Sequence, residues 1–147
     1  MKTKQKTKLL KTAEQTEQQL ADSDALFTAA TASLYELDPT NPKSINGLIL
    51  IDHAGNVYEL LKRTTLTGSN PIALTTLGWA APIDNNPDDL PPSQHQNRRR
   101  VSLFIMVNQA GQMASVLRFK DTPNETTTDD GEATGALAKA LLNLITT

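Results

Sequence analysis

The side chains best suited to chemistry gather in one stretch of the sequence, between Gly78 and Arg100. Arginine guanidinium groups bind carboxylates and phosphates through paired hydrogen bonds, and a tryptophan ring offers a stacking face. This combination is typical of a site for a small anionic ligand or an acidic partner peptide. The candidate binding residues are Trp79, His95, Arg98, Arg99, Arg100 and, farther along the chain, Arg118.

A structural role is the alternative for the arginine run. Arg98 to Arg100 begin an apolar stretch that predicts a strand, and successive side chains of a strand point to opposite faces. Charged residues at the start of a strand also discourage pairing between sheet edges. Both interpretations of the arginines stay open on the sequence alone.

Catalytic, cofactor and metal motifs do not accompany these residues. Ser93 precedes His95 by two positions, but their proline-rich loop lacks the strained turn that presents a nucleophile. There is no glycine-rich phosphate loop and no cysteine, and neither His53 nor the acidic run 84–89 has the spacing of a metal site. We therefore predict no catalytic residue, no cofactor and no metal.

Length and charge limit the class of protein further. The 147 residues suit one domain of roughly 100–200 residues, and a net charge of −2 argues against a nucleic-acid-coating protein. Residues 1–8 carry no apolar residue after Met1, which predicts a disordered basic tail before a single domain over residues 9–147. Because no apolar run suits a membrane span or a signal peptide, we expect a cytoplasmic protein.

Helical periodicity is found at both ends of the chain. The segment Leu9–Leu37 has no Gly or Pro and repeats apolar residues at helical spacing, so it predicts a helix, which Asp22-Ser23 could divide in two. After an acidic loop over Asp121–Glu132, the segment Ala133–Ile145 carries one apolar stripe and predicts the last helix.

The middle of the chain predicts strands. Two hairpins are expected, each with a glycine near the end of its turn: Ile45–Ile51 with Val57–Thr64, and Val101–Val107 with Met113–Lys120. Their matching turn sequences reflect either the same turn chemistry or an internal duplication. The alternating residues of Ile72–Ala81 favour a strand over a short helix.

These elements predict an α+β fold. We expect a four- to five-stranded antiparallel sheet built from the two hairpins, with the N- and C-terminal helices packed on one face. The polar segment Pro82–Arg98 is a loop of a length that is uncommon and often functional or disordered.

The C-terminal half resembles a family of small uncharacterised actinobacterial proteins. The resemblance is carried by Gly78-Trp79-Ala80-Ala81-Pro82, Pro92-Ser93-Gln94-His95, Arg98-Arg99-Arg100-Val101 and Ala114-Ser115-Val116-Leu117-Arg118-Phe119. It also includes Gly131-Glu132-Ala133-Thr134-Gly135 before the last helix. The family has no established activity, so the resemblance points to the long loop but assigns no role to any residue.

We therefore expect a non-enzymatic binding or regulatory module that uses the Trp79–Arg100 loop. The alternative is an enzyme, or an enzyme subunit, that holds a small anionic substrate in a clamp of Arg98–Arg100 and Arg118. A weaker third interpretation is a nucleic-acid accessory factor that uses its basic tail. The exposed edges of an antiparallel sheet would also allow a homodimer.

Overall fold

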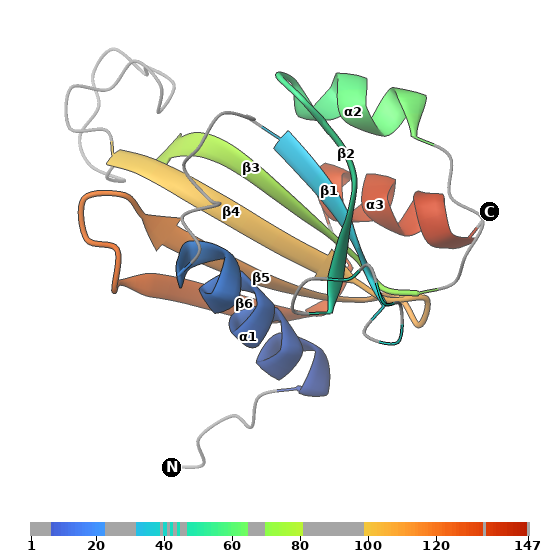
Figure 1. Cartoon of the computed structure of the whole chain (residues 1–147), viewed down its shortest axis with the longest axis horizontal. Helices are drawn as coiled ribbons and strands as arrows, with labels where there is room; N and C mark the ends of the chain where they lie inside the picture. Colours follow the sequence, from blue (N-terminus) through green and yellow to red (C-terminus); the bar gives the residue numbers. More distant parts are fainter. Residues whose placement is uncertain are drawn as a thin grey trace.

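The fold is one antiparallel sheet with helices on both sides (Figure 1). The computed structural model describes residues 7–22, 32–38, 40, 42, 44, 47–64, 70–80, 99–133 and 135–146. Within these residues, six strands follow the order β2-β1-β3-β4-β5-β6, and each neighbouring pair is antiparallel. The elements are α1 (Lys8–Asp22), β1 (Ala32–Leu37), β2 (Leu48–Ala54), α2 (Val57–Arg63), β3 (Ile72–Ala80), β4 (Arg99–Val107), β5 (Gln112–Phe119), β6 (Thr126–Glu132) and α3 (Ala136–Thr146).

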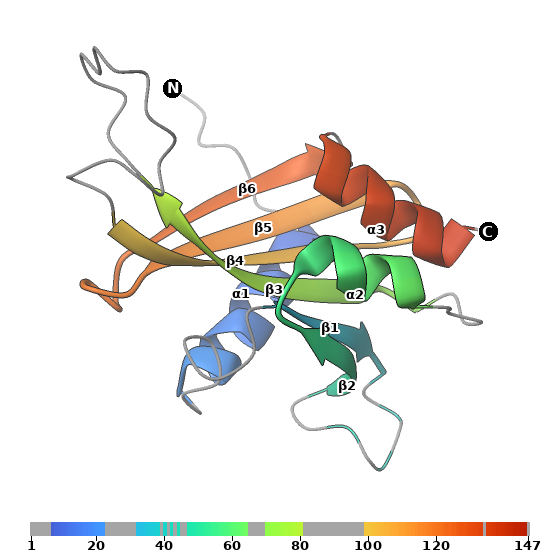
Figure 2. The same cartoon turned by 90° about the horizontal axis from the view of Figure 1, so that it is seen from above.

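Alternation along the central strand β4 divides the core into two halves. Phe104 is fully buried on one face, where it belongs to the same cluster as Leu10 of α1. The next residue, Ile105, points to the other face and clusters with Leu60 of α2 and Leu141 of α3. We call these two sides the α1 face and the α2/α3 face (Figure 2).

The prediction that both terminal helices cover one face is therefore wrong. The terminal helices α1 and α3 lie on opposite faces, and α2 shares the side of α3. The physical reason is the nearly unbroken burial of β4 from Val101 to Val107, in which only Leu103 is partly exposed. A strand buried on both faces needs an apolar layer on each side.

The N-terminal helix covers only the first part of the segment Leu9–Leu37, and it ends where the sequence allows a division at Asp22-Ser23. It begins at Lys8, the last residue of the predicted tail, and ends at Asp22, while residues 1–6 lie outside the described part. The segment Ala32–Leu37 is strand β1, held between β2 and β3, with Leu34 completely buried. Because its apolar residues fit both helical and alternating spacing, pairing with two neighbouring strands decides the conformation.

The first predicted hairpin is also wrong, since the segment after β2 is helix α2. The side chain of Asn56 caps this helix, and its Oδ1 accepts hydrogen bonds from the backbone N–H groups of Tyr58 at 2.8 Å and Glu59 at 3.2 Å. Leu60, one turn later, is completely buried beneath the helix. A capped first turn and one deeply buried leucine favour a helix over an edge strand.

The two segments with matching turn sequences thus adopt different structures. Gly55 and Asn56 lead from β2 into α2, whereas Asn108 to Gly111 close the β4–β5 hairpin that the sequence predicts. Gly111 has φ of 84°, which favours glycine at this turn.

The sheet has six strands, not four to five. The segment predicted as an acidic loop contains β6, whose residues pair with β5 along its length. Its run of threonines suits the pleated surface of a strand, although three acidic residues stand among them. The strand over Ile72–Ala80, the β4–β5 hairpin and the C-terminal helix are confirmed. None of the described helices is long and apolar enough to cross a membrane.

The Asn56 cap provides a test of the helix that the sequence did not predict. We expect Asn56→Ala to lower the free energy of unfolding by about 1 kcal/mol, because two backbone donors lose their acceptor. Asn56→Asp, which keeps the acceptor, should stay close to the wild type. Urea denaturation of the three proteins measures this, and equal losses for both variants would contradict the capping role.

Candidate functional site

The described part of the predicted site lies at one end of the β3–β4 pair. β3 ends at Ala80 and β4 begins at Arg99, and the register places Trp79 opposite Arg100 and Ala80 opposite Arg99. Residues directly opposite each other in an antiparallel pair share a face of the sheet. The backbone of Trp79 therefore lies beside that of Arg100, although the two residues are separated by many residues in sequence.

Two of the predicted binding residues lie outside the described residues. They are His95 and Arg98, and both belong to the segment Pro82–Arg98 that joins β3 to β4. Ser93, considered as a nucleophile beside His95, falls in the same segment. The site is therefore built here from Trp79, the arginines of β4 and β5, and their surroundings.

Strand alternation separates the arginines. Arg100, Ser102 and Phe104 follow one another at alternate positions and point to the α1 face, and Ser102 is directly opposite Arg118. Arg99 points to the α2/α3 face. Arg100 and Arg118 thus share a face, whereas Arg99 does not join them.

Arg99 connects the start of β4 to the turn between β5 and β6. Its guanidinium donates to both carboxylate oxygens of Asp121, with an Nη2–Oδ1 distance of 2.8 Å, and to the hydroxyl of Thr122 at 2.8 Å. Glu125 lies 3.7 Å from Nη1, and the guanidinium carbon sits 4.0 Å above the centre of the Phe119 ring. This geometry combines an ion pair with a cation–π contact.

The charges of this pair stabilise each other. Hydrogen bonding from Arg99 lowers the pKa of Asp121 below its ordinary value, and hydrogen bonding to Asp121 raises the pKa of Arg99. The Asp121 side chain is 61% exposed and that of Arg99 34% exposed, so solvent weakens the attraction. Arg99 is therefore a fixing point for the turn that remains within reach of solvent.

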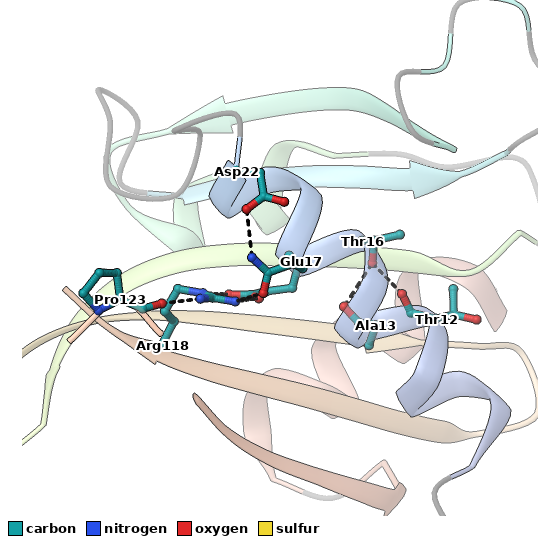
Figure 3. Close-up of polar contacts among 8 residues, drawn as sticks. Thr12, Ala13, Thr16, Glu17, Asp22, Arg118 and Pro123 are labelled. Atoms are coloured by element: carbon teal, nitrogen blue, oxygen red, sulfur yellow. Dashed lines mark hydrogen bonds and ion pairs between the residues drawn. The ribbon is translucent and has the colours of Figure 1, made fainter. Parts of the chain in front are cut away.

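Arg118 is buried and takes part in an ion pair with Glu17 of α1 (Figure 3). Its Nη2 and Nε donate to the two carboxylate oxygens of Glu17 at 2.6 and 2.7 Å, a two-pronged arrangement. Nη2 also donates to the side chain of Gln18 at 2.9 Å, and Nη1 donates to the carbonyl of Pro123. The side chains of Arg118 and Glu17 are 5% and 1% exposed.

The hydrogen bonds of the Arg118 guanidinium are made to other groups of the same chain. Hydrogen bonding to Glu17 raises the pKa of Arg118, and burial opposes that rise. The donors Nε, Nη1 and Nη2 each have an acceptor within the chain, and α1 covers the group. Arg118 thus holds α1 and the β5–β6 turn to the sheet, and it is not exposed to a ligand in this arrangement.

Glu17, Phe119 and Asp121 are not among the binding residues that the sequence predicts. A signal for Glu17 exists, because it occupies the same stripe of α1 as Leu10 and Ala13, at helical spacing. A carboxylate on an apolar stripe needs a buried partner of opposite charge. Asp121 offered no comparable signal, since it reaches Arg99 only through the fold of the β4–β5 hairpin.

His53, considered above as a possible metal ligand, and the neighbouring Asp52 lie beside Arg63 of α2. Asp52 accepts two hydrogen bonds from Arg63, which lower its pKa, and His53 lies beside it on an exposed part of β2. Within the described ranges, no three His, Cys, Asp or Glu side chains are close enough together to hold a metal ion.

A cavity of about 370 Å³ opens at the opposite end of β4 from Arg99. It lies between the start of α1, the end of β1, the start of β3 and the β4–β5 turn, and Lys8 is the charged residue among the described residues that line it. The remaining lining residues are Thr7, Leu9, Thr12, Leu37, Pro71, Asn108 and Gln112.

Comparison of the chain with protein-family models, with curated proteins and with solved structures gives no significant match. The function must therefore be inferred from the geometry of the chain itself.

The buried ion pair gives the first prediction at this site. We expect Glu17→Ala to lower the free energy of unfolding by about 3–5 kcal/mol, because it leaves the Arg118 guanidinium buried without its counter-charge. Replacing both partners, as Glu17→Leu with Arg118→Met, should cost much less. Urea denaturation measures both, with Gln19→Ala on the exposed side of α1 as control. A double variant as unstable as Glu17→Ala would contradict this account.

The Arg99–Asp121 pair gives a prediction about pH. Since folding lowers the pKa of Asp121 below its ordinary value of 3.8, the pair stabilises the fold fully above that pH. The stabilisation is lost as the pH falls through the lowered pKa. The urea midpoint of Asp121→Asn should therefore fall less than that of the wild type on acidification below about pH 4. In an Arg99→Gln background the same substitution should make little difference, and an undiminished effect there would contradict the pairing.

Proposed function

We propose that this chain is a non-enzymatic binding module that recognises an anionic partner with the end of the β3–β4 pair. The binding surface consists of the opposed residues Trp79 and Arg100, with Arg99 on the other face, and it includes the segment Pro82–Arg98 that joins the two strands in the sequence. The preferred partner is an acidic peptide segment of another protein. A small anion would bind through the same contact between its negative charge and arginine.

The observation that carries this proposal is the position of Trp79 directly opposite Arg100 at the end of a paired ladder. Because strand pairing fixes both backbones, the distance between the backbones of Trp79 and Arg100 is set before any ligand binds. Arginine supplies planar donors for a carboxylate, and the indole supplies a stacking face for the apolar part of the same ligand.

The distribution of the other arginines supports binding more than catalysis. A clamp for a small substrate needs several guanidinium groups that converge on one point, but Arg99 and Arg118 point to opposite faces and each has an internal carboxylate partner. The alternative of an enzyme with an arginine clamp would have to do without Arg118. An extended acidic partner, in contrast, can follow the strand end without such convergence.

The single tryptophan makes the proposal directly measurable. We expect an Asp/Glu-rich peptide to change the emission of Trp79 in a saturable titration, and we expect raised salt to weaken the binding because the attraction is electrostatic. Arg100→Glu should lower the affinity by about tenfold or more, since it replaces attraction by repulsion at the proposed contact.

A matched control separates this surface from charge in general. Lys139→Glu makes the same change of charge on an exposed position of α3, so it should leave the titration nearly unchanged. Equal loss of affinity in both variants would indicate attraction to the net charge alone. A titration without any change of Trp79 emission, together with no binding in a calorimetric experiment, would reject the proposal.

A further inference from the structure

The two outer strands of the sheet differ sharply in how they are protected. β6 carries Asp129, Asp130 and Glu132, and such charges on an outer strand discourage another strand from pairing. The outer strand at the other side, β2, is uncharged from Leu48 to Ile51 and consists there of four aliphatic residues. Charge therefore protects β6 over its C-terminal half, whereas the first charged residue of β2 is Asp52.

Exposed apolar side chains are found at the β2 end of the sheet. Among the described residues, the large hydrophobic side chains that are well exposed are Leu50 of β2, at 50%, and Tyr58 of α2, at 68%. The helix α2 packs on β1 and β2, so both residues lie at the β2 end of the sheet (Figure 2). Leu50 lies opposite Tyr35 of the α1 face, whereas Tyr58 belongs to a helix of the α2/α3 face. An aliphatic outer strand with an exposed leucine at its centre is a typical site of strand addition.

We propose that β2 pairs with β2 of a second copy of this chain, antiparallel and around a twofold axis at Leu50. The two six-stranded sheets then form one continuous sheet across the dimer. This inference is independent of the proposed binding surface, because β1 lies between β2 and β3, the strand that carries Trp79.

The charge pattern of β2 fits its own copy in this register. Leu50 faces Leu50 of the second copy, and Ile49 faces Ile51, so aliphatic side chains meet at each central position. Asp52 faces Leu48 of the second copy, not another carboxylate, and its charge is already balanced by Arg63 at 2.9 Å. No like charges are opposed within the paired stretch.

Two features limit the contact to a closed and modest dimer. The register between β1 and β2 shifts at Leu34/Tyr35, which leaves Ile51 as the extra residue of β2. Such an irregularity bends the strand, so the regular paired stretch beside Leu50 is short. Pairing of β2 with the other edge, β6, would join copies head to tail without closing, and it would place the carboxylates of β6 against aliphatic side chains. A twofold pair of β2 strands closes on itself, and it keeps the carboxylates of β6 away from the aliphatic side chains of β2.

Sedimentation velocity of the full chain over a range of concentrations tests the proposal. We expect the wild type to shift from monomer to dimer, Leu50→Lys to weaken association by about tenfold or more, and Thr127→Lys on exposed β6 to associate like the wild type. A wild type that stays monomeric would overturn the proposal. Equal weakening in both variants, which indicates β2–β6 contacts, would overturn it as well.

The absence of cysteine allows a second measurement that does not depend on the stability of Leu50→Lys. Directly opposed residues of an antiparallel pair have Cβ atoms close enough for a disulfide after a small adjustment. Leu50→Cys should therefore form a covalent dimer under mild oxidation, whereas Thr127→Cys should stay a monomer. Failure of Leu50→Cys to cross-link, or equal cross-linking of Thr127→Cys, would contradict the β2 pairing.

Discussion

The buried ion pair between Arg118 and Glu17 is the interaction on which the arrangement of this molecule depends. It fixes α1 to β5, and through the carbonyl of Pro123 it also holds the turn between β5 and β6. On the opposite face of the sheet, Arg99 holds the same turn through Asp121 and Thr122. Two arginines from adjacent strands thus fix one turn from both sides of the sheet.

The structural roles of these two arginines change the interpretation of the arginine-rich sequence. A run of arginines with another arginine nearby suggests a single anion clamp, but Arg118 and Arg99 serve mainly to join elements of the fold. Arg100 lies opposite Trp79 at the end of the β3–β4 pair. The proposed recognition surface is therefore narrower than the arginine content of the chain implies. It leaves out Arg118, while Arg99 contributes to it from the other face of the sheet and also holds the β5–β6 turn.

How much of the fold could be predicted depends on whether neighbouring residues or distant ones decide each element. The β4–β5 hairpin follows from local chemistry, since Gly111 adopts the positive φ that its turn requires. The helix after Asn56 was missed because an asparagine followed by mixed apolar residues serves a hairpin turn and a helix cap equally well. Strand β1 was missed because Leu34 is buried by pairing with two distant strands, which no local pattern records.

The sequence indicates which residue types could form a site but not how they are arranged. Their types group Trp79 with the arginines, and only the register of β3 and β4 shows that Trp79 lies opposite Arg100. Arg99 and Arg118 point to opposite faces of the sheet, and this separation is known only once the strands and their register are known.

The most direct test of the account is a map of amide and indole NMR shifts during titration with an Asp/Glu-rich peptide. The account predicts that the largest shifts occur at the Trp79 indole and at Arg99 and Arg100. Shifts centred instead on Gln112 and Lys8, which line the cavity at the other end of β4, would contradict it.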